Sequence, residues 1–507
     1  MTIEKIEAFV LKDKLSKSFF FSQWEYAERC ICVVKVTASN GEYGWGEAYG
    51  PATMVEAGIK LLESTVIGEN PLENEVIWNK MYRRTLDLSR RGVSMASISA
   101  IDIAIWDLKG KILGLPVSTL LGGAHRKKIQ PYATGLYFTN HENFSDGFVE
   151  EAKLYVSQGF KAMKMKVGLG IKEDVANVKL IRETIGPDIQ LMVDSNHAYT
   201  FREAVELSKK IEQYEIAWFE EPISPEFYEQ YCELREKTTI PIAGGECEYL
   251  RFGFNDLIKN KSVDILQPDI CASGGLTEAK RIAALASTNG IDLIPHTWGT
   301  SIGLHVALHF IANIESVPGR MYQPDFLIEF DQTENGLRDN LSFPKLEIKD
   351  GMLEVPNRPG LGIDINEGYG MTENLAYGPA INMPNAVKIG SVGSIKALPH
   401  SEVKITDEGE IIVRSPSLMT GYYLEPEKTA ETIRDGWLHT GDRGEIDSDG
   451  YLTITGRVKD VFKTSKGKFV QPNKIEGLMQ RDTCIEQICV AGSGESQPFG
   501  LIELSED

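Results

Sequence analysis

Six polar residues follow short apolar runs of this 507-residue chain at a nearly constant spacing. Successive members lie 23 to 28 residues apart, about the length of one strand and one helix. The six are Lys166, Asp194, Glu220, Glu246, Asp269 and His296. The runs are mostly apolar, as parallel strands covered on both faces are, and span residues 161–167, 189–196, 216–222, 240–246, 263–270 and 291–298. The spacing predicts a β/α barrel with polar residues at one rim.

The stretches between these runs have helical character. They are residues 173–184, 202–214, 226–237, 252–260 and 277–288. Alternating strands and helices predict parallel strands joined by right-handed crossovers. Because the carboxyl ends of barrel strands meet at one mouth, residues distant in sequence are expected to come together there.

Composition indicates an ordinary enzyme of two or three domains. The net charge of −20 disfavours nucleic acid and anionic membrane surfaces as partners. Seven cysteines show neither paired zinc spacing nor a dense disulfide framework, and the N-terminus has no secretory signal, so we expect a cytoplasmic protein. His305 and His309 lie four residues apart on a predicted helix, but without an acidic neighbour we expect packing rather than a metal site.

Three of the rim residues are carboxylates from successive strands: Asp194, Glu220 and Glu246. Three convergent carboxylates repel one another unless a cation lies among them. Ligands that are all oxygen select a hard ion, and we predict Mg²⁺. A single acid more often caps a helix or pairs with a surface base, but three in register favour the metal site.

Lysine and histidine supply the candidate acid–base groups. Lys164 and Lys166 lie two apart on one strand, so both point into the barrel, where each is expected to lower the pKa of the other. The alternative is a solvated strand end. Asp269 ends the strand before His296 and would orient its imidazole for proton transfer.

These groups define one class of reaction. A divalent ion can hold a substrate carboxylate and stabilise the second negative charge that develops when the α-proton leaves. Lysine on one face and histidine on the other can then return a proton, which is racemisation, or assist loss of a β-hydroxyl, which is dehydration.

Several motifs carry a family resemblance over residues 1–366. They are Lys164-Met165-Lys166, Val193-Asp194-Ser195-Asn196, Trp218-Phe219-Glu220-Glu221-Pro222, Gly245-Glu246, Pro268-Asp269 and Pro295-His296. The chain here resembles the mandelate racemase subgroup of the enolase superfamily. The resemblance implies a modified TIM-type (β/α) barrel at 125–339 and an α+β capping domain at 1–124, which includes Gly44-Trp45-Gly46-Glu47 and is closed by strands within 340–366.

The resemblance also implies roles for individual residues. Asp194, Glu220 and Glu246 would bind Mg²⁺, Lys166 with its neighbour Lys164 would face the Asp269–His296 dyad, and Asn196 and Glu329 would contact substrate oxygens. A loop at residues 16–26, rich in aromatic residues, would either line the pocket or pack the cap on the barrel. Lysine-pair sites with a His–Asp dyad resemble dehydratases of aldonic and aldaric acids, so we expect dehydration, with racemisation or epimerisation of an α-hydroxy acid as the alternative. A homo-oligomer is compatible with this resemblance.

Residues 368–507 resemble something else. Gly436-Trp437-Leu438-His439-Thr440-Gly441-Asp442 and Thr455-Gly456-Arg457-Val458-Lys459-Asp460 are similar to the C-terminal portion of long-chain fatty acyl-CoA synthetases, which are adenylate-forming enzymes. The resemblance implies a nucleotide-binding remnant with Thr372 and Glu373 at the phosphate, Asp442 at the ribose, Arg457 at the nucleotide and a hinge at Lys459. Dense glycines and short alternating runs independently predict a small β-rich unit with some helix.

The synthetase phosphate-binding loop has no match, and the chain ends before that family's catalytic lysine, so ATP-dependent acyl-CoA ligation is not expected. The join near 366–368 lacks a Gly/Ser/Pro-rich linker. A natural fusion, an engineered chimera and an artefact of the sequence record are the alternatives, and the last two are favoured. A non-catalytic chimera, in which the barrel is inert, is the competing class of function.

Overall fold

The computed structural model divides into two compact units, Met1–Asp364 and Ile365–Asp507. It describes residues 1–22, 24–139, 145, 147–316, 319, 321, 326–365, 368–374, 380–381, 391–397, 400–458, 462–463, 465, 469–470, 475, 485–491 and 497–504. In this part of the chain, none of the helices has the length and apolar character that crossing a membrane needs.

The first unit begins with a three-stranded antiparallel sheet packed on helices. Gly44 and Gly46 of this sheet approach one helix so closely that a Cβ there would lie 2.1 or 2.0 Å from one of its carbonyl oxygens. That helix is apolar around most of its circumference and is correspondingly buried. The elements are β1 (Ile3–Phe21), β2 (Trp24–Ala38), β3 (Tyr43–Ala48), α1 (Ala52–Val66), α2 (Asn74–Thr85), α3 (Val93–Leu113), which is the helix in question, and α4 (Val117–Leu120). An α+β capping domain is present, as predicted.

The barrel strands that follow are parallel and hydrogen-bonded in the order β11-β4-β5-β6-β7-β8-β9-β10. Cα register pairs Lys166 with Asp194 and Asp194 with Glu220, so the predicted rim residues are direct neighbours. Each predicted apolar run contains its strand. The bounds are β4 (Lys128–Thr134), β5 (Ala162–Lys166), β6 (Gln190–Asp194), β7 (Ile216–Glu220), β8 (Ile242–Gly244), β9 (Ile265–Leu266), β10 (Asp292–Leu293) and β11 (Leu327–Asp331).

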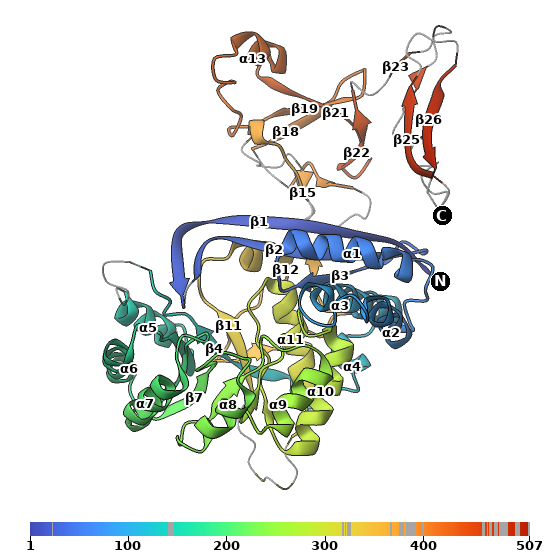
Figure 1. The fold of residues 1–507 in the computed structure, drawn as a ribbon. Coiled ribbons are helices and arrows are strands. Elements are labelled where there is room, and N and C mark those ends of the chain that lie inside the picture. The colour runs from blue at the N-terminus through green and yellow to red at the C-terminus, as the bar shows by residue number, and fades with distance from the viewer. Residues whose placement is uncertain are drawn as a thin grey trace. The chain divides into compact units, whose positions relative to one another are not determined.

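Helices alternate with these strands and cover the outside of the barrel (Figure 1). Five of them overlap the five predicted helical stretches. Thr200 caps α7 through a reciprocal capping box with Glu203, which fixes where that helix begins. The helices are α5 (Phe148–Ser157), α6 (Ile171–Ile185), α7 (Phe201–Ile211) continued by the 3₁₀ turn η1 (Glu212–Tyr214), α8 (Tyr228–Arg235), α9 (Leu250–Lys259), α10 (Gly275–Asn289) and α11 (Ser301–Asn313).

After the barrel the chain returns towards the cap, although not as the predicted closing strands. The segment contains α12 (Gly336–Asn340), β12 (Ser342–Phe343), β13 (Leu353–Glu354) and β14 (Asp364–Ile365). β13 pairs with barrel strand β4, and β12 pairs with β14. The cap is contacted by the loop before β14, where Gly360 O accepts from Val117 N and Leu361 N donates to Asp107.

The second unit is rich in β-structure, as predicted. An antiparallel sheet in the order β15-β16-β17-β22-β21-β19-β18, with β20 beside β21, surrounds a small core that includes Ile411, Val413 and Leu452. Its elements are β15 (Gly368–Tyr369), η2 (Thr372–Asn374), β16 (Ala380–Ile381), β17 (Gly393–Ser394), β18 (Glu402–Ile405), β19 (Glu410–Arg414), α13 (Pro426–Thr432), β20 (Ile433–Arg434), β21 (Trp437–Ile446) and β22 (Tyr451–Arg457). Two further strand pairs are β23 (Phe462–Lys463) with β24 (Phe469–Val470), and β25 (Ile485–Ala491) with β26 (Phe499–Leu504).

Candidate active site

The two lysines of β5 point into the barrel and contact its carboxylates. Lys164 Nζ is hydrogen-bonded to Glu220, lies 2.9 Å from Glu329 Oε1 and lies 3.6 Å from Asp194 Oδ2. Lys166 Nζ lies 2.6 Å from Asp194 Oδ2. The predicted lowering of pKa is wrong for Lys164. Burial lowers its pKa, but Glu220 and Glu329 outweigh burial and hold the pKa well above its usual value.

The predicted metal ligands Asp194 and Glu220 are fully buried, and Glu246 is nearly so. Burial raises the pKa of Glu220 to about 7 although Lys164 opposes this. The oxygens of the three carboxylates are not all within 4.8 Å of one another. Among the described residues, the group of acidic, histidine and cysteine side chains that meets this distance is His197, Glu221 and Cys247. The ammonium group of Lys164 instead bridges Asp194 and Glu220.

Charge balance tests whether these residues fit a divalent cation. The rim brings together three cationic side chains, Lys164, Lys166 and His296, with the five carboxylates Asp194, Glu220, Glu246, Asp269 and Glu329. With all five carboxylates and all three cationic groups ionised, the charges sum to −2 (3 positive and 5 negative). A divalent ion with oxygen ligands removes this excess, so the residues fit Mg²⁺.

His296 and Asp269 form the predicted dyad. His296 Nδ1 lies 2.7 Å from Asp269 Oδ2, and Asp269 Oδ1 accepts from Cys271 N at 2.7 Å. His296 Nε2 lies 3.5 Å from Glu246 Oε2 and 4.0 Å from Glu329 Oε2. Burial lowers the pKa of His296, but these carboxylates outweigh burial and raise the pKa to about 10. In this arrangement the imidazole is a proton donor.

The two lysines, from β5, and His296, from the segment after β10, line one small pocket. Asn196 and Glu329, the predicted substrate contacts, also line it. Asn196 Oδ1 accepts from Lys166 at 2.8 Å. The remaining wall is aromatic and consists of Phe21, Tyr49, Tyr137 and Trp298. The structure therefore brings Lys166, His296, Asn196 and Glu329 together in one pocket, and the roles assigned to them stay predictions.

The predicted loop at residues 16–26 is the tip of the β1–β2 hairpin rather than a loop. Phe21 lines the pocket, and Lys166 Nζ lies 5.0 Å from its ring centroid. Phe19 instead packs against Tyr26 and Tyr137, while Trp24 is exposed. Both predicted roles, pocket lining and packing, thus occur on this hairpin.

Sequence reasoning missed the residues that fix the carboxylates. Gln267 Nε2 and Trp218 Nε1 donate to Glu220 Oε2 at 2.7 and 2.9 Å. Thr134 Oγ1 donates to Glu329 Oε1 at 2.6 Å. Trp218 lies two residues before Glu220 on β7 and so shares its face of the strand, a signal that was available, whereas Gln267 lies just beyond β9.

The other histidine and C-terminal predictions have simpler outcomes. His305 and His309 are buried in α11, where His309 bonds Ser118 N and Leu361 O and His305 donates to Ser301 O, so the expected packing is confirmed.

In the second unit, Arg457 Nε lies 2.8 Å from Asp442 Oδ1, and Glu373 accepts from Tyr422 Oη at 2.8 Å. Thr372 lies in η2, and Lys459 lies outside the described residues.

Comparison with known proteins identifies two family models, which together cover most of the first unit and the first residues of the second. Residues 5–122 match the mandelate racemase / muconate lactonizing enzyme N-terminal domain, and residues 147–369 match the enolase C-terminal domain-like model. Nothing in the comparisons supports an acyl-CoA synthetase fragment at residues 368–507. That part of the sequence interpretation therefore has no support beyond its motifs.

Relatives extend the match over most of the length of known proteins. A crystal structure of the 3,6-anhydro-D-galactonate cycloisomerase from Zobellia galactanivorans is 51% identical, with a TM-score of 0.66 over 72% of this chain and 97% of that one. The D-galactarolactone cycloisomerase of Agrobacterium fabrum is 38% identical over 72% of this chain and 97% of its own length. An L-talarate/galactarate dehydratase mutant liganded with Mg and L-glucarate is 27% identical, with a TM-score of 0.64 over 72% of this chain and 89% of that one.

These matches agree with the site. The matches cover the predicted cap and barrel, and solved relatives contain bound magnesium. The chain is a member of the mandelate racemase / muconate lactonizing enzyme family of the enolase superfamily.

Proposed function

We propose that this protein removes the α-proton of a sugar acid and expels an oxygen substituent from the neighbouring β-carbon, with Mg²⁺ as cofactor. The observation that carries the proposal is the pocket that Lys166 and His296 line together with Asn196 and Glu329. A base and an acid in one pocket are what elimination from adjacent carbons needs. The proposal assigns no chemistry to residues 368–507.

Asp194, Glu220 and Glu246 would hold the Mg²⁺. When bound, the ion supplies positive charge that stabilises the developing negative charge of the substrate carboxylate. Gln267 and Trp218 hold one oxygen of Glu220 and so preserve its orientation.

Lys166 is assigned as the base. Its Nζ is held between Asp194 Oδ2 and Asn196 Oδ1 at the pocket wall. Lys164 is engaged by Glu220 and Glu329, so it acts as a fixed positive charge that positions these carboxylates. The covalent bond between the α-carbon and its hydrogen breaks, its electron pair forms the new carbon–carbon double bond, and the proton passes to the lone pair of Lys166 Nζ in its neutral amine form.

His296 is assigned as the acid. As the double bond forms, the β-carbon–oxygen bond breaks and its electron pair leaves with the oxygen, which takes a proton from His296 Nε2. Asp269 keeps a proton on Nδ1 and fixes the plane of the ring. The enol product becomes a 2-keto-3-deoxy acid by proton transfer to carbon.

The leaving oxygen distinguishes two substrate classes. In a 3,6-anhydro sugar acid the leaving oxygen belongs to the ring and stays attached, so the reaction is a cycloisomerisation. The 51% identical relative of that activity and the aromatic pocket wall favour it, because an anhydro ring has fewer hydroxyl groups to satisfy than an open-chain acid. Dehydration of an open-chain aldonic or aldaric acid is the second candidate and is supported by the dehydratase relative.

The test combines ¹H NMR in D₂O with mass spectrometry, using the intact chain, Mg²⁺, 3,6-anhydrogalactonate and galactonate. Loss of the α-proton signal with an isomeric keto acid supports cycloisomerisation, and a keto acid lighter by one water supports dehydration. Exchange of the α-proton without a new product indicates racemisation instead. No exchange with either acid or with other aldonic and aldaric acids, by a folded protein that binds Mg²⁺, would overturn the proposal.

A further inference from the structure

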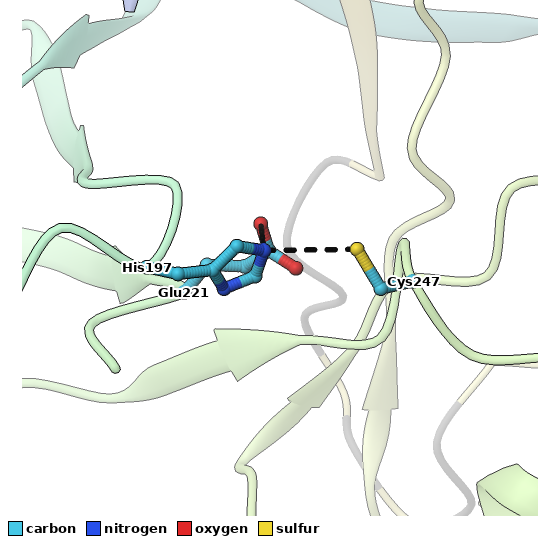
Figure 2. Close-up of side chains that lie close together, drawn as sticks. All are labelled: His197, Glu221 and Cys247. Atoms are coloured by element: carbon cyan, nitrogen blue, oxygen red, sulfur yellow. Dashed lines mark hydrogen bonds and ion pairs between the residues drawn. The ribbon is translucent and has the colours of Figure 1, made fainter. Parts of the chain in front are cut away.

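A second group of ligating side chains lies directly behind the rim. His197, Glu221 and Cys247 each follow a residue already assigned to the site, and they come from the ends of β6, β7 and β8. Figure 2 shows the three side chains converging on one point. His197 Nε2 lies 3.0 Å from Glu221 Oε2 and 3.6 Å from Cys247 Sγ, and all three ligand atoms lie within 4.8 Å of one another.

The polar atoms of this group contact one another, and the Cys247 thiol, at hydrogen-bonding distance from His197 Nε2, is the proton donor within the group. Glu221 is only 1% exposed, and its Oε2 has no hydrogen-bond partner. His197 Nδ1 lies 3.3 Å from Ile223 O, where it donates a hydrogen bond, so a neutral imidazole turns the Nε2 lone pair towards the Glu221 carboxylate. Two acceptors in contact at a buried position are unfavourable unless a proton or a metal cation lies between them.

The distances match a tetrahedral metal centre. With Zn–S of about 2.3 Å and Zn–N of about 2.05 Å, a tetrahedral angle separates sulfur from nitrogen by about 3.6 Å and nitrogen from a carboxylate oxygen by about 3.3 Å. The sulfur–nitrogen separation here is 3.6 Å, which agrees, and the nitrogen–oxygen separation is 3.0 Å, which is slightly shorter. We propose that His197, Glu221 and Cys247 form a Zn²⁺ site, separate from the Mg²⁺ site, with a solvent ligand completing the coordination.

The two proposed sites differ in their ligand atoms, and so in the ion that each prefers. Thiolate and imidazole prefer Zn²⁺, whereas the all-oxygen set of Asp194, Glu220 and Glu246 prefers Mg²⁺. Hydrogen bonds hold the His197, Glu221 and Cys247 group in place. His197 N and Ser195 Oγ both donate to the backbone oxygen of Glu221 at 2.8 Å. Cys247 is exposed, which gives an ion access from solvent.

The experiment titrates Co²⁺, a spectroscopic substitute for Zn²⁺, into the full-length protein in saturating Mg²⁺. We expect one equivalent to produce a thiolate-to-cobalt absorption band, which Zn²⁺ then displaces. Cys247→Ser should abolish the band. His197→Gln should weaken Co²⁺ binding by about 100-fold or more, which exceeds the loss expected for a residue that only hydrogen-bonds to a metal ligand. The matched control is Cys232→Ser on α8, which should leave both the band and the affinity unchanged.

Absence of the band in the wild-type protein would show that a charged His197–Glu221 ion pair explains the group, and a band that survives Cys247→Ser would place the ion elsewhere. Either result overturns the site. A second measurement uses the wild-type protein, so it does not depend on whether the variants fold. Iodoacetamide should alkylate Cys247 about tenfold more slowly with Zn²⁺ than without it, while the exposed Cys489 reacts equally in both cases. Equal rates at Cys247 would contradict the proposal.

Discussion

Each unit of the molecule contains a histidine–carboxylate pair, and the two pairs differ in their surroundings rather than in their own geometry. His296 Nδ1 lies 2.7 Å from Asp269, and His439 Nδ1 lies 2.8 Å from Glu410. Around His296, burial lowers the pKa, but the surrounding carboxylates outweigh burial and raise the pKa to about 10, whereas the His439 side chain is 19% exposed in a β-sheet. A catalytic dyad is thus distinguished by the charges and the pocket around it, because these set how strongly the pair holds its proton.

The largest expected effect is on kcat/KM, when an acidic residue of the first unit is replaced and compared with one of the second unit. Glu246→Gln keeps the shape of the side chain but removes one proposed Mg²⁺ ligand, and we expect kcat/KM to fall by about a thousandfold or more because metal stabilisation contributes several kcal/mol. Asp442→Ala in the second unit should change kcat/KM by less than about twofold. Steady-state kinetics across a range of Mg²⁺ concentrations checks this. An equal loss in both variants would mean that the second unit takes part in the reaction.

The two histidines give the next comparison. His296→Asn removes the proposed acid and should lower the rate of elimination by about 10²- to 10⁴-fold. His439→Asn removes the similar pair in the second unit and should leave that rate unchanged. Product formation is followed by NMR, with circular dichroism to confirm folding. A similar loss in both variants, with both folded, would contradict the distinction drawn between the pairs.

Acid should destabilise the first unit through its buried histidines. Burial lowers the pKa of His305 and His309 to about 4, below the unfolded value near 6.5, so the unfolded state binds more protons as pH falls. Stability should therefore be complete above about pH 6.5 and decline towards pH 4, by roughly 2 kcal/mol per histidine at pH 5. Thermal unfolding at pH 8 and pH 5 checks this. His309→Gln should reduce the difference and the exposed His125→Gln should not; an unchanged difference in the first variant would contradict the assignment.

The smallest effect is expected at the ion pair of the second unit. The Arg457 side chain is 63% exposed, so its contact with Asp442 is screened by solvent. Arg457→Ala should lower the free energy of unfolding of this unit by less than about 1 kcal/mol. Urea unfolding followed by the fluorescence of Trp437 measures it. A loss several times larger would show that this pair supports the sheet more than an exposed ion pair does.

Much of the fold and site followed from spacing in the sequence. Lys166, Asp194 and Glu220 end their strands as predicted, while Glu246, Asp269 and His296 lie two or three residues beyond strands that are shorter than the apolar runs. Strand ends near a barrel mouth are shortened because the chain turns into loops that carry the site. The His197, Glu221 and Cys247 group was missed because its members are 24 and 26 residues apart, far from any compact metal motif.

The sequence by itself determined which residues lie on which face, because the alternation of a strand and the strand–helix repeat are local and periodic. Lys164 and Lys166 point inward for that reason alone. Only the tertiary structure decided what those side chains meet. Glu329, from the far end of the barrel domain, contacts Lys164 and contributes to raising its pKa, the reverse of what the lysine pair alone predicted. Electrostatic environment sums contributions from all elements packed around a group, and such contributions have no period in the sequence.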